Sequence, residues 1–495
     1  MSLLPRALRF LLATLAATGT AHASPLFELA GASTGNGGFD ARATGAGAPS
    51  TYFNPGLLPH ATQGFELGVL VLSDQISMTL DGRRGGAVPL SVGDRSMFGA
   101  NGEPISNATV PTDWLEHGCT QCGAPQFQAR PRQAAGSSGN TRVYTVIGLV
   151  SDLIQKRLVL GFYALVPLGD FTTANSFYND EREQFFSNSL HPEFYADRMT
   201  ATSLAFGAGS QIVDRLSFGI SFTLNLTNTA AARTYVRDPI DYDKLLMSTD
   251  VKVRTSVSPH FGLVYDALDW LHLSATVHSE QYFNIDVGVA AALPAGQESG
   301  TQRRSVHSLV PWTFGLGTAV DVSKGPSHTV SVVGNLRYAL WSDYQDRHGE
   351  RPGDDDPALE FKDVFAGTAG VRYDLGALRT FADVNYQPTP VPPQTGRRNY
   401  VDNDRLGAVL GADYRFSLLG LDFRAGAQAQ AQRLLYRHQT KDNARIVDEL
   451  PDDAVDESGQ PVAGAGGLQT NNPGWPGFAS EGWILGGAVS LALLY

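Results

Sequence analysis

A serine in a glycine-flanked pentapeptide is the first candidate for chemistry in this sequence. Gly31-Ala32-Ser33-Thr34-Gly35 matches the G-x-S-x-G pattern of a nucleophile. That motif requires a strand before the serine and a helix after it. Residues 24–62 are rich in glycine, alanine and small polar residues and show no sustained period of two or 3.6. The segment predicts a compact, irregular structure, and we expect no catalysis at Ser33.

The two cysteines lie close together, in the sequence His117-Gly118-Cys119-Thr120-Gln121-Cys122. A redox or metal site and a small loop disulfide both fit this spacing. A lone pair of cysteines has too few ligands for a structural zinc site. Because a secretory signal precedes them, as described below, we favour a disulfide between Cys119 and Cys122.

Acidic runs and histidines are the remaining candidates for a metal site or an enzyme. Residues 354–356 and 452–457 are rich in Asp and Glu, but their spacing does not match an EF-hand loop, and we expect solvated loops. The histidines show no triad-like arrangement with a serine; they include His260, His272, His278 and His307. The sequence therefore predicts no metal, no cofactor and no enzyme.

Composition favours a strand-rich protein. Among 495 residues there are 53 glycines, 10% aromatic residues and only 17% charged residues, which suits many glycine-kinked strands better than a helical enzyme. The formal net charge of −12 gives no basic footprint for nucleic acid, so we expect no nucleic-acid partner.

The N-terminus reads as a secretory signal. Arg6 and Arg9 form a positive region, residues 10–17 form a short apolar core, and Ala21-His22-Ala23 is an A-x-A cleavage site. Residues 1–23 are therefore the predicted signal peptide. Beyond them the sequence has no run of 18 apolar residues, so we expect no spanning helix. A membrane location then requires a barrel.

The last stretch of the chain alternates strictly. One face is apolar with an aromatic residue at each end; its members are Trp483, Leu485, Gly487, Val489, Leu491, Leu493 and Tyr495. The opposite face consists mostly of small residues. This pattern is typical of a barrel strand with a lipid-facing exterior and aromatic side chains at the interfaces. A soluble sandwich strand can show the same alternation.

The rest of the chain repeats this pattern and predicts an all-β transmembrane antiparallel barrel of about 14 strands. The expected spans are 64–82, 141–151, 157–166, 199–212, 215–229, 247–265, 270–291, 305–321, 328–343, 363–374, 378–388, 405–416, 420–438 and 480–495. Short and long connections alternate, as periplasmic turns and outer loops do in bacterial outer-membrane barrels. Inward-facing charges are expected to bond one another and the N-terminal segment: Asp383, Asp413, Arg415, Asp422 and Arg424. One of these arginines is also a candidate for holding a carboxylate headgroup.

Several motifs in order resemble the FadL outer-membrane transporters (the OMPP1/FadL/TodX family). The Asn54-Pro55-Gly56 sequence is similar to the family's hatch motif, although Gly56 replaces the usual alanine. Residues 161–169 are similar to its third strand and the exit into a large loop. Residues 387–392 and the sequence Asp402-Asn403-Asp404-Arg405 are similar to its Pro-x-Pro loop and Asp-Asn-Asp-Arg motif. The resemblance covers the mature chain except the long loops 83–140 and 439–479.

The resemblance implies a plugged barrel for passive uptake of hydrophobic molecules such as long-chain fatty acids or aromatic hydrocarbons, and we expect long-chain fatty acids. Residues 24–62 would form the hatch, and residues 63–495 the barrel. In this family the third strand is kinked and opens the wall sideways, which places the exit at Pro167 and Gly169. Clustered apolar residues in the following loop predict an outer capture site: Phe185, Phe186, Leu190, Phe194 and Tyr195.

The expected partners are a hydrophobic small molecule, outer-membrane lipid and the barrel-assembly machinery, reached through the C-terminal strand ending in Tyr495. We expect a monomer. A porin for polar solutes and a structural or adhesin barrel are the alternatives.

Overall fold

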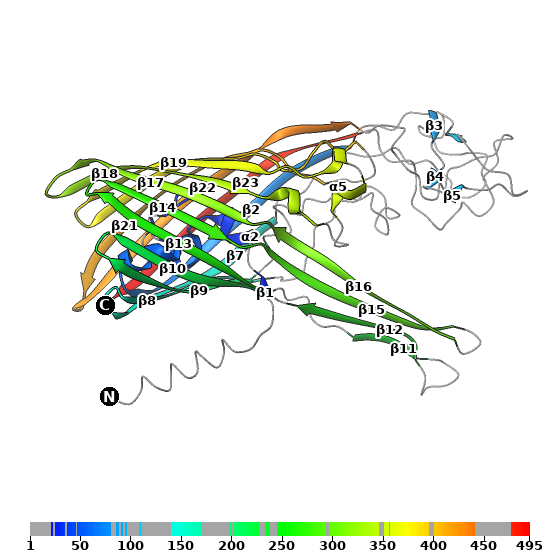
Figure 1. The fold of residues 1–495 in the computed structure, drawn as a ribbon, viewed down its shortest axis with the longest axis horizontal. Helices are drawn as coiled ribbons and strands as arrows, with labels where there is room; N and C mark the ends of the chain where they lie inside the picture. Colours follow the sequence, from blue (N-terminus) through cyan, green and yellow to red (C-terminus); the bar gives the residue numbers. More distant parts are fainter. Residues whose placement is uncertain are drawn as a thin grey trace, which may run out of the picture.

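Antiparallel strands close into a barrel in the computed structural model (Figure 1). The structure describes residues 21–22, 25–34, 37–45, 47–80, 86–88, 91–92, 95–96, 108–110, 140–169, 199, 202–226, 233–237, 245–254, 256–293, 297–345, 351–355, 357–395, 400–440 and 477–495. Among these residues no helix is both long and apolar enough to cross a membrane.

The main sheet has 15 strands, and 14 of them form the wall once the two-residue β1 (Ala21–His22) is set aside. The wall strands are β2 (Gly64–Leu80), β7 (Asn140–Ile154), β8 (Leu158–Pro167), β9 (Thr202–Val213), β10 (Leu216–Leu226), β13 (Ser256–Leu268), β14 (Leu271–His278), β17 (Thr313–Lys324), β18 (His328–Ala339), β19 (Val364–Leu375), β20 (Leu378–Gln387), β21 (Arg405–Leu418), β22 (Leu421–Thr440) and β23 (Gly477–Leu494). Each pairs with the next along the chain, and pairing of β2 with β23 closes the ring. The predicted 14-stranded barrel is confirmed.

A second sheet continues out of one end of the barrel. It contains β11 (Arg233–Arg237), β12 (Leu245–Arg254), β15 (Gln281–Leu293) and β16 (Gln297–Val310), in that order. Figure 1 shows these strands leaving at the end opposite the C-terminus. The predicted spans 247–265, 270–291 and 305–321 are therefore wrong as single strands, because each is divided between the wall and this sheet.

A proline marks one of these divisions. Pro311 separates β16 from β17. A proline has no amide hydrogen for the ladder, so continuous pairing ends more easily there.

Short elements complete the described chain. They are the helices α2 (Pro25–Ala30), α3 (Ser50–Phe53) and α5 (Pro352–Asp355), the 3₁₀ turns η1 (Pro55–His60), η5 (Trp341–Asp343) and η6 (Pro357–Leu359), and the strands β3 (Gly86–Val88), β4 (Ser91–Val92), β5 (Arg95–Ser96) and β6 (Ala108–Val110).

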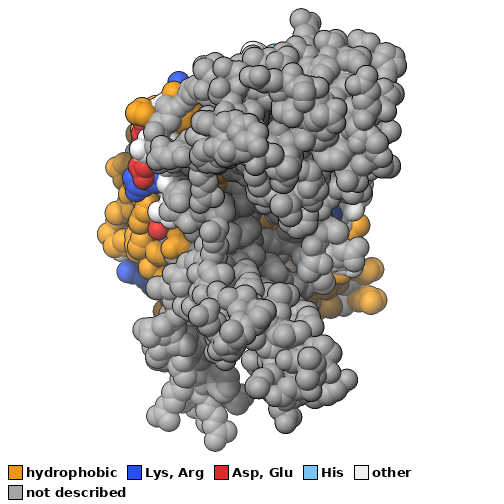
Figure 2. Space-filling model, turned by 90° about the vertical axis from the view of Figure 1, so that its right-hand side faces the viewer, with side chains coloured by type: hydrophobic (Ala, Val, Ile, Leu, Met, Phe, Trp, Pro, Cys, Tyr) orange, Lys and Arg blue, Asp and Glu red, His pale blue; other side chains and the backbone are white. Residues whose placement is uncertain are grey.

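The wall is apolar on its outside. In β2, Phe65, Leu67 and Val69 are exposed, whereas the intervening Glu66 and the later Leu70 are buried. The other wall strands repeat this inversion, and Figure 2 shows hydrophobic side chains along the described flanks of the molecule. Exposed apolar residues alternating with buried polar ones around a closed sheet are the signature of a strand in lipid.

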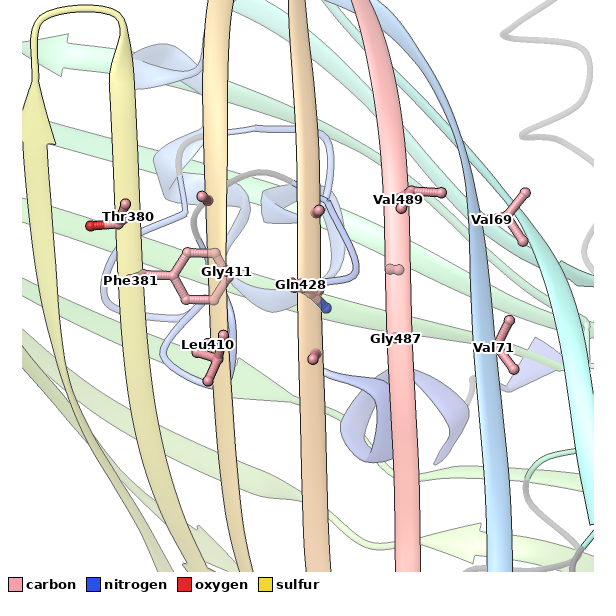
Figure 3. A pocket seen from close by; sticks show the side chains of 13 residues that line it. Val69, Val71, Thr380, Phe381, Leu410, Gly411, Gln428, Gly487 and Val489 are labelled. Atoms are coloured by element: carbon pink, nitrogen blue, oxygen red, sulfur yellow. The ribbon is translucent and has the colours of Figure 1, made fainter.

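The described part of the N-terminal segment, residues 25–34, 37–45 and 47–62, lies inside the barrel. Its helices α2 and α3 and the turn η1 are almost wholly buried, and in Figure 3 they lie behind the strands of the wall. The segment contacts strands on opposite sides of the ring: η1 packs on β8, β9, β10 and β13, whereas residues 37–40 bond side chains of β19 and β20. Contacts on both sides are possible only from within the lumen.

Candidate functional site

A row of lumen-facing glycines forms the floor beneath η1. Gly161 of β8 lies beside Gly207 of β9, Gly209 of β9 beside Gly219 of β10, and Gly219 beside Gly262 of β13. A β-carbon on Gly209 would lie 2.7 Å from the Pro55 carbonyl oxygen, and one on Gly219 would collide with the Pro55 carbonyl group. Only glycine allows the turn to approach the wall so closely.

The predicted hatch motif lies on this floor. The Asn54 side-chain oxygen accepts a hydrogen bond from the Gly56 amide at 3.1 Å, which caps η1. The Asn54 side-chain nitrogen donates to the Arg42 carbonyl at 2.9 Å. A β-carbon on Gly56 would lie 2.9 Å from the Gly262 carbonyl group. This close approach explains why glycine stands at position 56.

A carboxylate on α2 is held by two arginines. Glu28 accepts hydrogen bonds from Arg42 of the N-terminal segment, from Arg337 of β18 and, at 2.7 Å, from the Tyr52 hydroxyl. His278 Nδ1 lies 4.0 Å from the same carboxylate. Burial acts to raise the pKa of Glu28, but the positive charges of Arg42 and Arg337 hold it far below its ordinary value. Glu28 is therefore ionised whenever α2 is seated.

A second set of charged side chains forms hydrogen bonds with the backbone of residues 37–40. Asp383 of β20 accepts hydrogen bonds from the amides of Phe39 at 2.9 Å and Asp40 at 3.3 Å, and it pairs with Arg372 of β19. Arg372 also donates to the Gly37 carbonyl at 2.9 Å. These bonds tie the backbone of the N-terminal segment to two neighbouring wall strands.

Asp40 is the unusual member of this set. Its Oδ1 accepts hydrogen bonds from Asn335 at 3.0 Å and from Thr368 at 2.5 Å. Burial, followed by the nearby charge of Asp383, raises the pKa of Asp40 to about 6. Its protonation therefore changes near neutral pH.

The other charged residues predicted to face the lumen differ in what they contact. Arg424 pairs with Glu66 of β2 at 3.2 Å, and Arg415 donates to the Thr62 hydroxyl at 3.1 Å. Asp413 is buried. Asp422 instead bonds Ser417 next to the β21–β22 turn, away from the N-terminal segment.

Sequence reasoning missed Glu28, Arg42, Arg337, Arg372 and Asp40. A signal for the wall arginines exists: each is a lone charge between apolar residues of a strand, as in Leu336-Arg337-Tyr338 and Val371-Arg372-Tyr373. In an inverted barrel such a residue points into the lumen.

The Asp402-Asn403-Asp404-Arg405 sequence anchors the loop that follows β20. Asp404 accepts hydrogen bonds from the Thr389 amide at 2.8 Å and from the Tyr386 hydroxyl at 2.9 Å, and Asp402 accepts one from the Thr389 hydroxyl at 2.6 Å. Asn403 donates to the carbonyls of Leu435 and Ser480 at 2.8 and 3.0 Å. Arg405 begins β21. These contacts give the motif a positioning role at the rim.

At the predicted sideways exit, β8 ends at Pro167, which pairs with Tyr144 of β7. The ladder between β8 and β9 is continuous from Val159 to Leu165. A β-carbon on Gly169 would meet nothing within 4 Å. The exit therefore stays a prediction. The capture residues Phe185, Phe186, Leu190, Phe194 and Tyr195, and the pair Cys119 and Cys122, lie outside the described residues.

The wall carries a shallow hollow of about 790 Å³ over β2 and β20–β23 (Figure 3). Exposed apolar side chains border it, among them Val69, Leu410 and Val489, and small residues such as Ala427 and Gly487 line it. These exposed residues lie on the lipid-facing side of the barrel, so the hollow is a feature of the outer surface.

No protein-family model matches the sequence, and no curated protein matches it. Among solved structures, a FadL homologue from Pseudomonas aeruginosa is similar with 14% identity and a TM-score of 0.48, covering 97% of this chain and 99% of that one. The toluene transporter TodX of P. putida is similar with 11% identity and a TM-score of 0.42, covering 91% of this chain and 94% of that one. The toluene transporter TbuX of Ralstonia pickettii is similar with 10% identity and a TM-score of 0.42, covering 96% of this chain and 99% of that one.

The structure of the barrel wall itself shows which class of protein this is. An even number of antiparallel strands closes on itself, the exterior is apolar, and charged and polar side chains point inward. The chain is therefore a transmembrane β-barrel of the bacterial outer-membrane type, with its N-terminal segment in the lumen.

Proposed function

We propose that this chain is a FadL-type channel that admits hydrophobic molecules through the outer membrane by passive diffusion. The observation that carries the proposal is a lumen filled by the chain's own N-terminal segment, inside a wall built for lipid. A permanently open pore for polar solutes does not need such a plug. The N-terminal segment, left after removal of residues 1–23, acts as the hatch.

The proposed route has three stages. The apolar residues Phe185, Phe186, Leu190, Phe194 and Tyr195 collect the substrate outside. The hatch then shifts on its glycine floor, and the substrate leaves sideways into the membrane beside β8, near Pro167 and Gly169. Long-chain fatty acids fit this route because they are apolar along most of their length.

Uptake by intact cells tests the function. Cells that lack their own fatty-acid channels and express this chain should accumulate labelled oleate several-fold faster than cells with an empty vector. The matched variant Phe185→Ser with Phe186→Ser should reduce that gain. Equal uptake with and without the chain would refute the proposal.

Conductance separates this function from a porin. In a planar bilayer the intact chain should pass only small, intermittent currents, because the N-terminal segment fills the lumen. A large steady current would instead support a water-filled porin.

A further inference from the structure

Helix α2 has the chemistry of an amphiphilic acid lodged in the lumen. Its apolar side chains Leu26, Phe27 and Leu29 are 0–2% exposed, and between them it carries a single carboxylate, Glu28. The helix thus presents one negative charge to β18 and a compact apolar body to β8, on the opposite side of the ring.

The apolar body fills a pocket made by the wall. The Phe27 ring lies 5.0 Å from the Tyr163 ring of β8 and 4.6 Å from that of Tyr52. The same buried cluster includes wall residues from neighbouring strands: Leu70, Leu72, Tyr144, Val146, Leu165 and Ile484. The volume that α2 occupies is therefore an apolar site lined by the barrel.

The groups that receive the Glu28 carboxylate are held independently of α2. Arg337 belongs to β18 and also donates to Gln387 of β20 at 3.1 Å. The Arg42 backbone carbonyl accepts hydrogen bonds from Asn54 at 2.9 Å and from Ser274 of β14 at 3.0 Å. If α2 alone leaves, the Arg42 backbone and the Arg337 side chain keep these bonds, and both guanidinium groups lose their carboxylate.

Leaving two arginines without an anion in this site is unfavourable. Breaking a buried pair by removing one partner leaves an uncompensated charge, which is far more costly than exchanging one anion for another. Arginine forks fit any carboxylate, whether it comes from a side chain or from a ligand. A ligand that brings a carboxylate and an apolar chain therefore replaces both parts of α2.

We infer that α2 is a built-in pseudo-ligand: Glu28 occupies a carboxylate site formed by Arg42, Arg337 and Tyr52, and an incoming hydrophobic carboxylate displaces it. This inference rests on the proposed function and narrows its substrate class to acids. Neutral hydrocarbons fill the apolar pocket but leave the arginines unpaired, so they release α2 poorly.

Binding of oleate and of oleyl alcohol, measured on the full chain in lipid nanodiscs, tests the inference. The two probes share one apolar chain and differ in the carboxylate. In Glu28→Gln the competing charge is gone, so oleate should bind at least about tenfold more tightly than to the unaltered chain, whereas oleyl alcohol should change by less than about twofold. Arg337→Gln should abolish the preference for oleate over the alcohol.

A matched control is Asp40→Asn, which neutralises another carboxylate of the N-terminal segment, one that is bonded by Asn335 and Thr368. A change in how firmly the whole segment is seated would alter the binding of both probes alike, so the ratio of the two affinities should stay unchanged in this variant. Heat-modifiable migration on gels shows that each variant is folded.

The outcomes separate the inference from the function. An unchanged affinity ratio in Glu28→Gln, while oleyl alcohol still binds and crosses, overturns the pseudo-ligand and leaves the channel intact. If neither probe binds to any folded variant, the proposed function fails as well. Exchange of the α2 amides with solvent should rise on addition of oleate but not of the alcohol.

Discussion

Asp40 shows how one buried side chain makes the N-terminal segment sensitive to pH. It faces Asp383, Arg372, Thr368 and Asn335, and its pKa is raised to about 6 by burial and by the Asp383 charge. A carboxyl whose folded-state pKa is raised stabilises the seated segment fully below its ordinary pKa near 4, and this stabilisation is lost as the pH rises through about 6.

We expect Asp40→Asn to remove that dependence. The free energy of unfolding of the variant, relative to that of the unaltered chain, should rise from pH 4 to pH 7 by an amount on the order of 2–3 kcal/mol. The thermal midpoint of the variant should rise with it. Thermal unfolding in detergent across this range checks it. Parallel pH profiles for the two proteins would contradict the role assigned to Asp40.

Gly56 is the residue-scale test of the glycine floor. Its β-carbon position lies 2.9 Å from the Gly262 carbonyl group. Gly56→Ala should weaken the seating of η1 by roughly 1–3 kcal/mol, as overpacking does elsewhere, and should raise hydrogen exchange in residues 50–60. Gly367→Ala is the control, because the nearest atom there, a backbone oxygen of Asn335, lies at 4.0 Å. Equal exchange in both variants would argue against a tight floor.

At the scale of elements, the β8–β9 ladder decides whether substrate leaves sideways. Ala164 and Leu204 are paired across this ladder, close to the end of β8. In a Cys119→Ser, Cys122→Ser background, the double variant Ala164→Cys with Leu204→Cys should transport normally when reduced and lose most uptake when oxidised, because a disulfide prevents the strands from parting. Full uptake after verified oxidation would rule out an exit at this position.

The element scale also shows where sequence reasoning reached its limit. Alternation in the sequence located the wall strands well, because the inward and outward faces differ in chemistry at every second residue. The alternation also led us to predict β12 and β13 as one strand, and β14 and β15 as another, because the alternating pattern continues where the chain passes from the wall into the second sheet. The division depends on which neighbour each backbone pairs with: β13 pairs with β10, whereas β12 pairs with β11 and β15.

At the scale of the whole molecule, the apolar exterior makes the barrel intolerant of outward charges. Leu410 is 65% exposed near the middle of β21. In a soluble protein an arginine there would be harmless, but in lipid it should cost about 2–4 kcal/mol. We expect Leu410→Arg to lower the urea midpoint for unfolding from lipid vesicles.

Leu419→Arg is the matched control for this substitution. Leu419 is 93% exposed in the β21–β22 turn, outside the lipid-facing band, so the variant should unfold like the unaltered chain. Equal midpoints for the two arginine variants would speak against a membrane-spanning wall.

The sequence by itself determined the class of the molecule: a period of two with aromatic ends and alternating short and long connections specifies a closed, inverted sheet, because these signals are local. It also located Asn54, Pro55 and Gly56 as a turn. Only the tertiary structure decided what that turn rests on, since the glycine floor draws residues 161, 207, 209, 219 and 262 from four strands. The same holds for Glu28 and Arg337, which are far apart in the chain and meet only because the barrel closes around its own N-terminal segment.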